Sequence, residues 1–202
     1  EGERSTQKNL GAKNAKGEYL YFVDSDFILD PNIVSECVTK IGNVDMIAVH
    51  NTSDPKVSFW SRVRKFERDL LKYDRDNISP RFLKKTAFDA VNGFNAKLVA
   101  GEDYDIYNRL LAKNFKLGFI EAEEMHLGEP KNIRQIISKH FYYGQTLGNV
   151  ESEDAAVITI WQKSPNKKAY IKNFYKFILK PHLAIGLIIY NLVRYAAAIG
   201  GY

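Results

Sequence analysis

The chain has one cysteine and no apolar stretch at its start. Cys37 has no partner for an internal disulfide, which favours a reducing compartment and excludes a cysteine-based zinc site. Because it lies among apolar residues, we expect it to be a small core residue. The polar and charged first residues argue against a signal peptide. The sequence also lacks an initiator methionine, so we expect a fragment of a longer protein.

Low-complexity segments and internal repeats are also missing from the 202 residues. A hydrophobic content of 45% is enough to build a core and excludes disordered and collagen-like chains. The formal net charge of +5 is a mild excess that favours phosphate-bearing ligands or anionic lipid. Nothing requires a nucleic acid, and we expect no such partner.

The apolar segments alternate between strand and helix patterns. Residues 19–23 form a continuous apolar run, which is typical of a strand covered on both faces. Asp30-Pro31 then predicts a helix start, with a stop at Gly42, and residues 46–49 predict another strand. This order predicts an α/β fold with a largely parallel sheet.

Further elements frame this pattern. Ser5 or Thr6 can cap a first helix that ends near Gly17. Residues 59–73 predict an amphipathic helix, and residues 101–113 predict a helix with Leu110 and Leu111 on its inner side. Two short strands are expected at 117–120 and 125–127. A periodic helix that contains His140 is expected at 133–144. We expect His140 to be a hydrogen-bonded core residue. Composition shifts near residue 150, which predicts a catalytic part over 1–150 and a basic helical tail over 151–202.

The tail combines lysines with apolar residues. One helical face carries Lys172, Lys176 and Lys180, and another carries Ile171, Phe174, Tyr175 and Ile178. The apolar run 183–193 is too short to span a bilayer and is followed by Arg194. We expect peripheral attachment to an anionic membrane surface; the alternative is a helix packed on the catalytic part with solvated lysines.

Asp24-Ser25-Asp26 follows the predicted strand 19–23 and therefore reaches the edge where open α/β sheets bind ligands. Two close carboxylates repel each other unless a cation lies between them. Mg²⁺ or Mn²⁺ binds one or two carboxylates together with phosphate oxygens, which predicts a divalent cation here. The alternative is that Asp24 caps the turn and Asp26 is solvated.

A second acidic cluster occupies residues 101–105. Carboxylates favour helix N-termini for electrostatic reasons alone. The preceding glycine-bearing loop, however, places Asp103 at the rim of a pocket, where it could take a proton from a hydroxyl. His126 is a candidate nitrogen ligand for the cation, or a surface histidine.

These motifs follow one another in a defined order: Lys8-Asn9-x-Gly11, Gly17-Glu18-Tyr19, Phe22-x-Asp24-Ser25-Asp26, Gly93-Phe94-Asn95, Glu102-Asp103-x-Asp105 and His126. The set resembles family 2 glycosyltransferases with the GT-A fold, over residues 4 to about 148. The resemblance implies an open sheet with helices on both faces. It also implies inverting, metal-dependent transfer of a sugar from a nucleotide-diphosphate sugar to a hydroxyl acceptor.

The resemblance assigns roles to the candidate residues. Asp24 and Ser25 would contact the donor ribose and sugar, Asp26 and His126 would hold Mn²⁺ or Mg²⁺, and Asp103 would be the general base. Lys8 and Asn9 would bind the donor, although the family usually has Arg at the first of these positions. Arg81 and Glu102 would lie on the acceptor side.

Two departures from the family matter. The strand and loop that bind the nucleotide base have no counterpart before Arg4, so we expect this part to be missing from the fragment. Processive relatives carry a Gln-x-x-Arg-Trp motif on a later helix. Gln135 is followed by Ile-Ile-Ser-Lys and therefore lacks the Arg-Trp pair of that motif, which disfavours processive synthesis.

Three functions remain open. The first is a cytoplasmic transferase attached to the membrane face, with an acceptor that is lipid-linked or membrane-proximal. The second is an inactive membrane-docked or carbohydrate-binding module with the same fold. The third is a haloacid-dehalogenase-like phosphatase, which the Phe27-Ile28-Leu29 sequence after Asp26 disfavours.

Overall fold

A computed structural model of the chain describes residues 3–75, 80–98, 101–148 and 167–201. The chain divides into two compact units. The first unit comprises Glu1–His50 and Ile78–Glu124, and the second comprises Asn51–Asn77 and Met125–Tyr202. The predicted boundary near residue 150 lies outside the described residues.

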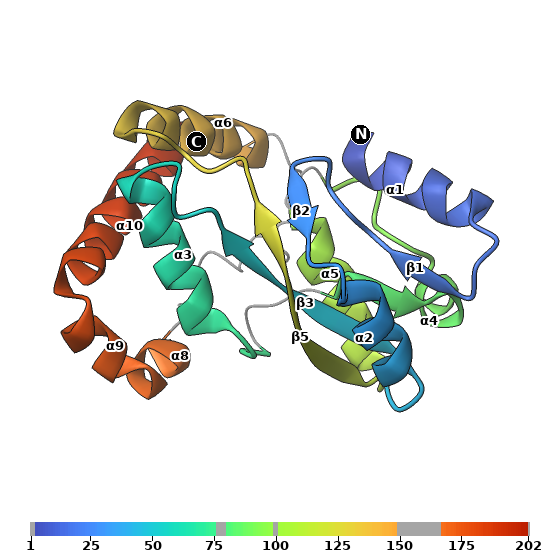
Figure 1. The fold of residues 1–202 in the computed structure, drawn as a ribbon. Coiled ribbons are helices and arrows are strands. Elements are labelled where there is room, and N and C mark those ends of the chain that lie inside the picture. Colours follow the sequence, from blue (N-terminus) through green and yellow to red (C-terminus); the bar gives the residue numbers. More distant parts are fainter. Residues whose placement is uncertain (1–2, 76–79, 99–100, 149–166, 202) are drawn as a thin grey trace. The chain divides into compact units, whose positions relative to one another are not determined.

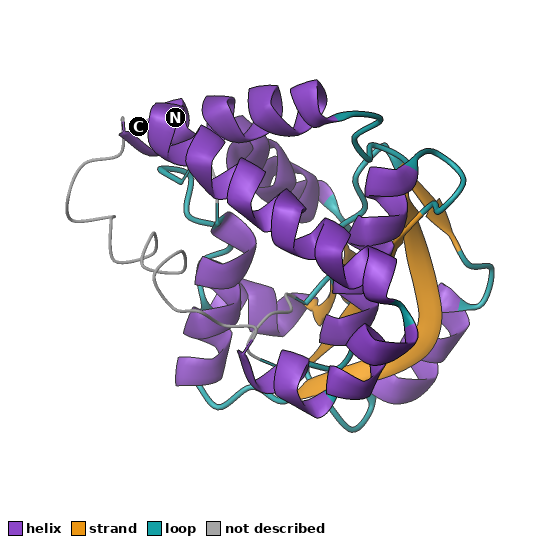
Figure 2. Ribbon diagram, turned by 90° about the vertical axis from the view of Figure 1, so that its left-hand side faces the viewer, coloured by secondary structure: helices purple, strands orange, loops and turns teal. Residues whose placement is uncertain are grey.

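The first unit holds most of the five-stranded sheet (orange in Figure 2). Its elements are α1 (Glu3–Asn14), β1 (Tyr19–Tyr21), β2 (Phe27–Leu29), α2 (Ile33–Ile41), β3 (Met46–Ser53), β4 (Phe82–Lys84), α4 (Lys85–Ala90), α5 (Glu102–Ala112) and β5 (Leu117–His126). The strand order is β1-β4-β3-β5-β2 (Figure 1). The last residues of β3 and β5 belong to the second unit.

The sheet is mixed, which corrects the expectation of a largely parallel one. β4 runs antiparallel to both β1 and β3. β3 and β5 run parallel, because the Asp45 amide at the start of β3 donates to the Lys116 carbonyl, and the Asp54 amide after its end donates to the His126 carbonyl. The predicted α/β class, with helices on both faces of the sheet, is confirmed with this change.

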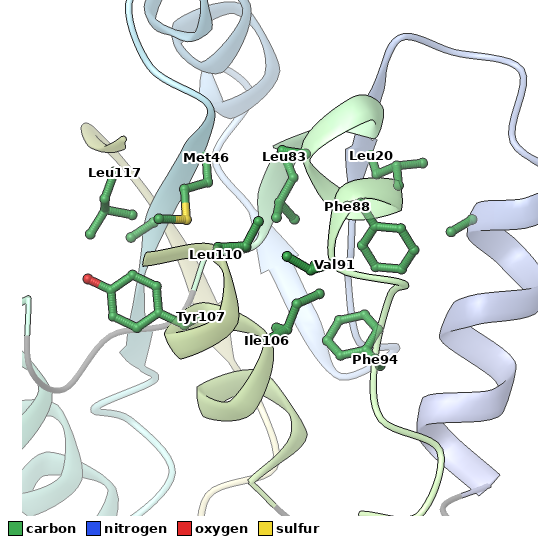
Figure 3. Close-up of a cluster of buried hydrophobic side chains, with 13 residues drawn as sticks. Leu20, Met46, Leu83, Phe88, Val91, Phe94, Ile106, Tyr107, Leu110 and Leu117 are labelled. Atoms are coloured by element: carbon green, nitrogen blue, oxygen red, sulfur yellow. The ribbon is translucent and has the colours of Figure 1, made fainter. Parts of the chain in front are cut away.

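Alternate strand residues separate into two cores on the two faces of the sheet. Met46 and Ala48 join a cluster with α1, α4 and α5, whereas Ile47 and Val49 join a cluster with α2. Figure 3 shows the first cluster, with Ile106 and Leu110 of α5 beside Phe88 and Phe94. This period of two is the expected geometry of a strand buried on both faces.

Several predicted boundaries were wrong. β1 covers only Tyr19–Tyr21 and has one fully buried residue, Leu20, because it is an edge strand in the described sheet. β2 was not predicted, and β5 is one strand where two were expected.

Helix details also differ from the predictions. Ser5 and Thr6 lie inside α1 rather than at its cap, and α2 starts after Asn32. Leu111 is exposed, whereas Leu110 is buried. Cys37 is buried as predicted, and burial raises the pKa of its thiol to about 12.

The second unit contains α3 (Phe59–Leu71), α6 (Ile133–Gly148), α8 (Lys167–Lys172), α9 (Phe174–Leu179) and α10 (Pro181–Gly201). α3 begins with a capping box between Ser58 and Ser61 and buries the predicted stripe through Val63, Phe66 and Leu70. α10 packs along α3 and α6 (Figure 1). By length and composition, α10 is also apolar enough to cross a membrane.

The predicted tail helix is interrupted at Asn173, between α8 and α9. The Asn173 amide donates to the carbonyl of Leu70 at 3.0 Å, and Lys176 Nζ donates to the carbonyl of Asp69 at 3.4 Å. These contacts attach the start of the tail to α3. Lys172 and Lys180 are exposed as expected.

Charged groups are buried where α3, α6 and α10 meet. Glu67 of α3 pairs with Arg64 and, at 3.2 Å, with Arg194 of α10. Burial alone would raise the pKa of Glu67, but the arginines lower it below its ordinary value.

His140 stacks edge-on against Tyr190, and burial lowers its pKa to about 4, so it is neutral at physiological pH. Its Nδ1 has no hydrogen-bond partner in the described structure, which corrects the expectation of a hydrogen-bonded histidine.

Gly186 is a point of close contact between α10 and α3. A Cβ atom added there would lie 2.6 Å from Val63 Cγ2 and 2.8 Å from Phe59 Cζ. We therefore expect Gly186→Val to lower the free energy of unfolding by about 2 kcal/mol through overpacking, as measured by chemical denaturation. Gly200→Val is the control, because nothing lies within 4 Å of that position. Equal stability of the two variants would contradict this packing.

Candidate active site

Asp24, Ser25 and Asp26 lie in the turn between β1 and β2. The side chain of Asp24 is partly buried, whereas Ser25 and Asp26 are exposed. β1 ends at Tyr21, so two loop residues, Phe22 and Val23, separate the strand from Asp24. The motif thus lies beyond the end of a strand, as its spacing predicted.

Arg81 connects this turn to the buried interior of the first unit. Its Nη2 atom lies 2.9 Å from Asp24 Oδ2, and its Nε atom lies 2.8 Å from Glu124 Oε1. Nε also donates to the carbonyl of Phe22 at 3.1 Å. On the other side, the Tyr21 hydroxyl donates to Glu124 Oε2 at 2.9 Å. Because the Glu124 side chain is 0% exposed, this chain of contacts has a fixed anchor.

This arrangement sets the charge of the Asp24 carboxylate. Burial by itself would raise the pKa of Asp24, but the hydrogen bond and the charge of Arg81 lower it below its ordinary value. Burial and the neighbouring Glu124 raise the pKa of the Tyr21 hydroxyl, which therefore stays protonated as a donor. Asp24 is thus held ionised and in one orientation.

Arg81 was predicted on the acceptor side, and that role stays a prediction. The structure instead connects it with Asp24, a predicted donor residue. Tyr21 and Glu124 were not singled out in the sequence, where Glu124 is one of several acidic residues in the segment Glu121-Ala122-Glu123-Glu124. An acidic residue inside a strand pattern is the signal that could have identified it, because a buried carboxylate requires a partner.

A second cluster joins α1 to the start of α5. Lys8 Nζ lies 3.2 Å from Asp103 Oδ1 and 3.5 Å from Glu102 Oε1, and it lies over the ring of Phe94. Arg4 approaches Glu102 at 3.6 Å. Three predicted site residues, Lys8, Glu102 and Asp103, are therefore brought together from positions far apart in the sequence.

The acidic residues of this cluster differ in accessibility. The side chain of Glu102 is 4% exposed and that of Asp103 is 37% exposed. Asp105 is 13% exposed and forms an ion pair with Arg109 at 2.5 Å. Asp103 is therefore the carboxylate of this helix start that a solvent-borne molecule can reach most easily.

Asn9 fastens the glycine-bearing loop to α1. Its Nδ2 donates to the carbonyl of Phe94, and its Oδ1 accepts from the Phe94 amide, both at 2.8 Å. Gly93 has a φ of +66°, and a Cβ there would lie 2.6 Å from Asn9 Oδ1. The side chain of Asn9 thus has a supporting role, while the predicted donor contact stays a prediction.

His126 belongs to the second unit. Its Nδ1 lies 2.9 Å from Glu129 Oε1, which also accepts from Ser53 at 2.8 Å and pairs with Arg68 at 2.8 Å. Burial alone would raise the pKa of Glu129, but the bond to His126 and the arginines lower it to about 2. A carboxylate on Nδ1 leaves the lone pair of a neutral imidazole on Nε2, as in histidines that ligate metals.

Each of the two predicted metal ligands is suited to a divalent cation by its own chemistry. Asp26 supplies an exposed carboxylate in the first unit, and His126 supplies an oriented imidazole in the second. Among the described residues, no three His, Cys, Asp or Glu side chains gather into a preformed metal site. A cation bound to either residue would therefore depend on phosphate oxygens and water for most of its ligands.

One protein-family model matches the first half of the chain. Residues 3–99 match the family model described as glycosyl transferase family 2. This segment contains α1, the Asp24-Ser25-Asp26 turn, Arg81 and the Gly93 loop. No curated protein matches the chain.

Two solved structures of one protein are similar to this chain. The crystal structure of TarS from S. aureus is 15% identical, with a TM-score of 0.47, and the match covers 79% of this chain and 30% of that one. The structure of S. aureus TarS 1–349 is 13% identical, with a TM-score of 0.48, and the match covers 98% of this chain and 61% of that one. The chain thus spans less than two thirds of either structure.

The Glu124 anchor can be tested by an isosteric change. Glu124→Gln leaves the Arg81 guanidinium without its buried counter-charge, and we expect a loss of about 3 kcal/mol in the free energy of unfolding. Glu121→Gln, an exposed site in the same strand, should change it by less than about 0.5 kcal/mol. Chemical denaturation of both variants measures the difference. A Glu124→Gln protein as stable as the control would show that the ion pair does not hold the turn.

Proposed function

We propose that this chain is a glycosyltransferase of family 2, whose model matches residues 3–99, and that it transfers a sugar from a nucleotide-diphosphate sugar to a hydroxyl acceptor with inversion. The observation that carries the proposal is the contact of Lys8 with Asp103 across 95 residues of sequence. It joins the α1 segment of the family match to an accessible carboxylate. The alternative function, a haloacid-dehalogenase-like phosphatase, is not supported by a comparable contact or family match.

Asp103 is the proposed general base. It is the most exposed of the acidic residues at the start of α5, whereas Glu102 is buried beside Lys8 and Asp105 is paired with Arg109. Its carboxylate accepts the proton of the acceptor hydroxyl as the oxygen attacks the anomeric carbon. One direct displacement of the nucleoside diphosphate then inverts the configuration at that carbon.

The donor side is built around Asp24. Arg81 holds its carboxylate in one orientation, so the oxygen that faces away from Arg81 can accept a hydrogen bond from a ribose or sugar hydroxyl without reorganisation. The Lys8 ammonium has three donors, and its charge suits the diphosphate of the donor. Ser25 is exposed in the same turn and offers a further hydroxyl.

A divalent cation, Mn²⁺ or Mg²⁺, is proposed as the cofactor. Asp26 and His126 would hold it, and the cation would neutralise charge on the departing diphosphate. Glu129 keeps the imidazole of His126 oriented through Nδ1.

The acceptor is proposed to be lipid-linked or membrane-proximal, and the enzyme to act at the cytoplasmic face of the membrane. The lysines and apolar residues of α8 to α10 support this placement. An inactive membrane-docked or carbohydrate-binding module would have the same surface. Such a module transfers no sugar, so a change at Asp103 would have no effect on activity.

The base assignment predicts a specific loss of turnover. In the full-length protein, Asp103→Asn keeps the shape of the side chain but cannot take the proton, so kcat should fall by about 10²–10⁴-fold. Release of nucleoside diphosphate from a panel of nucleotide-diphosphate sugars measures it. Binding of the nucleoside diphosphate, followed by calorimetry, should stay within about twofold.

Asp89→Asn is the matched control, since Asp89 is exposed on α4. Near-normal turnover of Asp103→Asn would contradict its role as base. Absence of any turnover in the unmodified full-length protein, with every donor tried, would instead favour the inactive module.

The cofactor assignment predicts that metal binding depends on Asp26. Asp26→Asn should weaken Mn²⁺ binding in the presence of nucleoside diphosphate by about tenfold or more, as measured by calorimetry, because one anionic ligand is lost. Asp30→Asn, another exposed aspartate of the same segment, should leave the affinity unchanged. Unaltered Mn²⁺ affinity in Asp26→Asn would remove this residue from the site.

A further inference from the structure

Helix α10 has two apolar faces. One is buried, with Leu183, Leu187 and Tyr190 packed in a cluster with Val63 and Phe66 of α3. The other consists of Ile185, Ile188, Leu192, Tyr195 and Ile199, which are 41–76% exposed. We call this second set the α10 stripe.

The α10 stripe is continuous. Its members follow one another at spacings of three and four residues, so at 100° per residue they lie within an arc of about 80°, roughly opposite the buried face. From Ile185 to Ile199 the stripe is about 21 Å long. A surface helix usually presents polar groups on this side, and an uninterrupted exposed apolar patch marks an interaction site.

The charge of the same segment identifies the kind of partner. Residues 163–202 contain six lysines, one arginine and no aspartate or glutamate, so they carry +7, and the remaining residues together carry −2. Lys168, Lys172 and Lys180 are exposed on α8 and at the start of α10. Exposed isoleucine and leucine next to lysine, without acidic residues, match a surface that is apolar below and anionic above, as in a bilayer with acidic lipids.

The contacts of α10 determine how it meets the bilayer. Arg194 is the fourteenth of the 21 residues of the helix, its side chain is 15% exposed, and it pairs with Glu67 of α3 at 3.2 Å. Gly186 lies against Val63 and Phe59. A helix that crossed the bilayer would carry this ion pair and the buried arginines of α3 into hydrocarbon, at a large cost.

From these observations we propose that the α10 stripe is a lipid-binding surface, on which α10 lies in the plane of an anionic membrane with its opposite face packed on α3 and α6. The inference of a lipid-binding surface depends on the residues of α10 and not on the proposed function. Its purpose, to bring the enzyme to a lipid-linked acceptor, rests on the proposed function.

Vesicle binding tests the surface directly. The full-length protein should co-sediment with vesicles of equal parts phosphatidylcholine and phosphatidylglycerol, and far less with phosphatidylcholine alone. Ile188→Glu combined with Leu192→Glu should weaken this binding by about tenfold or more. Val34→Glu with Val38→Glu is the matched control, because these residues are also exposed, lie four apart on α2 and are absent from the stripe.

The lysines supply the second arm of the test. Lys172→Gln and Lys180→Gln should each weaken binding to the anionic vesicles by about fivefold, and high salt should have the same effect on the unmodified protein. Binding that is unchanged in the Ile188 and Leu192 variant overturns the proposal. So does a protein that ignores both vesicles and self-associates through the stripe, as seen by analytical ultracentrifugation.

Depth measurements distinguish lying from spanning. Ile185→Cys and Ile199→Cys, each carrying an environment-sensitive fluorophore, mark the two ends of the stripe, and Cys37 is buried and does not compete for the label. Quenching by lipids brominated at known depths should give the same shallow depth for both. Depths that differ by most of the helix length overturn the in-plane arrangement. Vesicle binding without any glycosyl transfer would count against the proposed function and leave the lipid surface in place.

Discussion

The first unit depends on the pairing of one partly buried guanidinium with one fully buried carboxylate. A charge removed from water costs several kcal/mol unless it is paired, so Arg81 and Glu124 each require the other. Their pairing has a direct consequence at the surface, because the same guanidinium reaches Asp24 in the turn after β1. The orientation of the Asp24 side chain is thereby set by a residue inside the sheet.

The second cluster follows the same logic. The acidic start of α5 has a cation of its own, Lys8 from α1, which contacts both Glu102 and Asp103. Each acidic motif of the proposed site is thus accompanied by one basic residue from a distant part of the chain. These basic residues offset the repulsion between neighbouring carboxylates. The proposed site therefore retains negative charge that could accept a proton or bind a cation.

The sequence predicted elements whose periodicity is strong and missed those that depend on distant partners. The central part of the α3 stripe was correct because Val63, Phe66 and Leu70 recur at helical spacing, whereas Phe59 and Tyr73, which were predicted as its ends, are exposed. β2 has three residues and no pattern that separates it from a loop. The role of Arg81 could not be predicted, because its partners are 57 and 43 residues away and only the folded sheet brings them together.

The paired bonds between Asn9 and the Phe94 backbone carry an evolutionary consequence. The side-chain amide fits only while position 93 lacks a Cβ, since such an atom would lie 2.6 Å from Asn9 Oδ1. A larger residue at either position is therefore tolerated only with a compensating change at the other. In a set of homologues, these two positions should covary although 84 residues separate them, and their joint loss would indicate a relative with a different loop conformation.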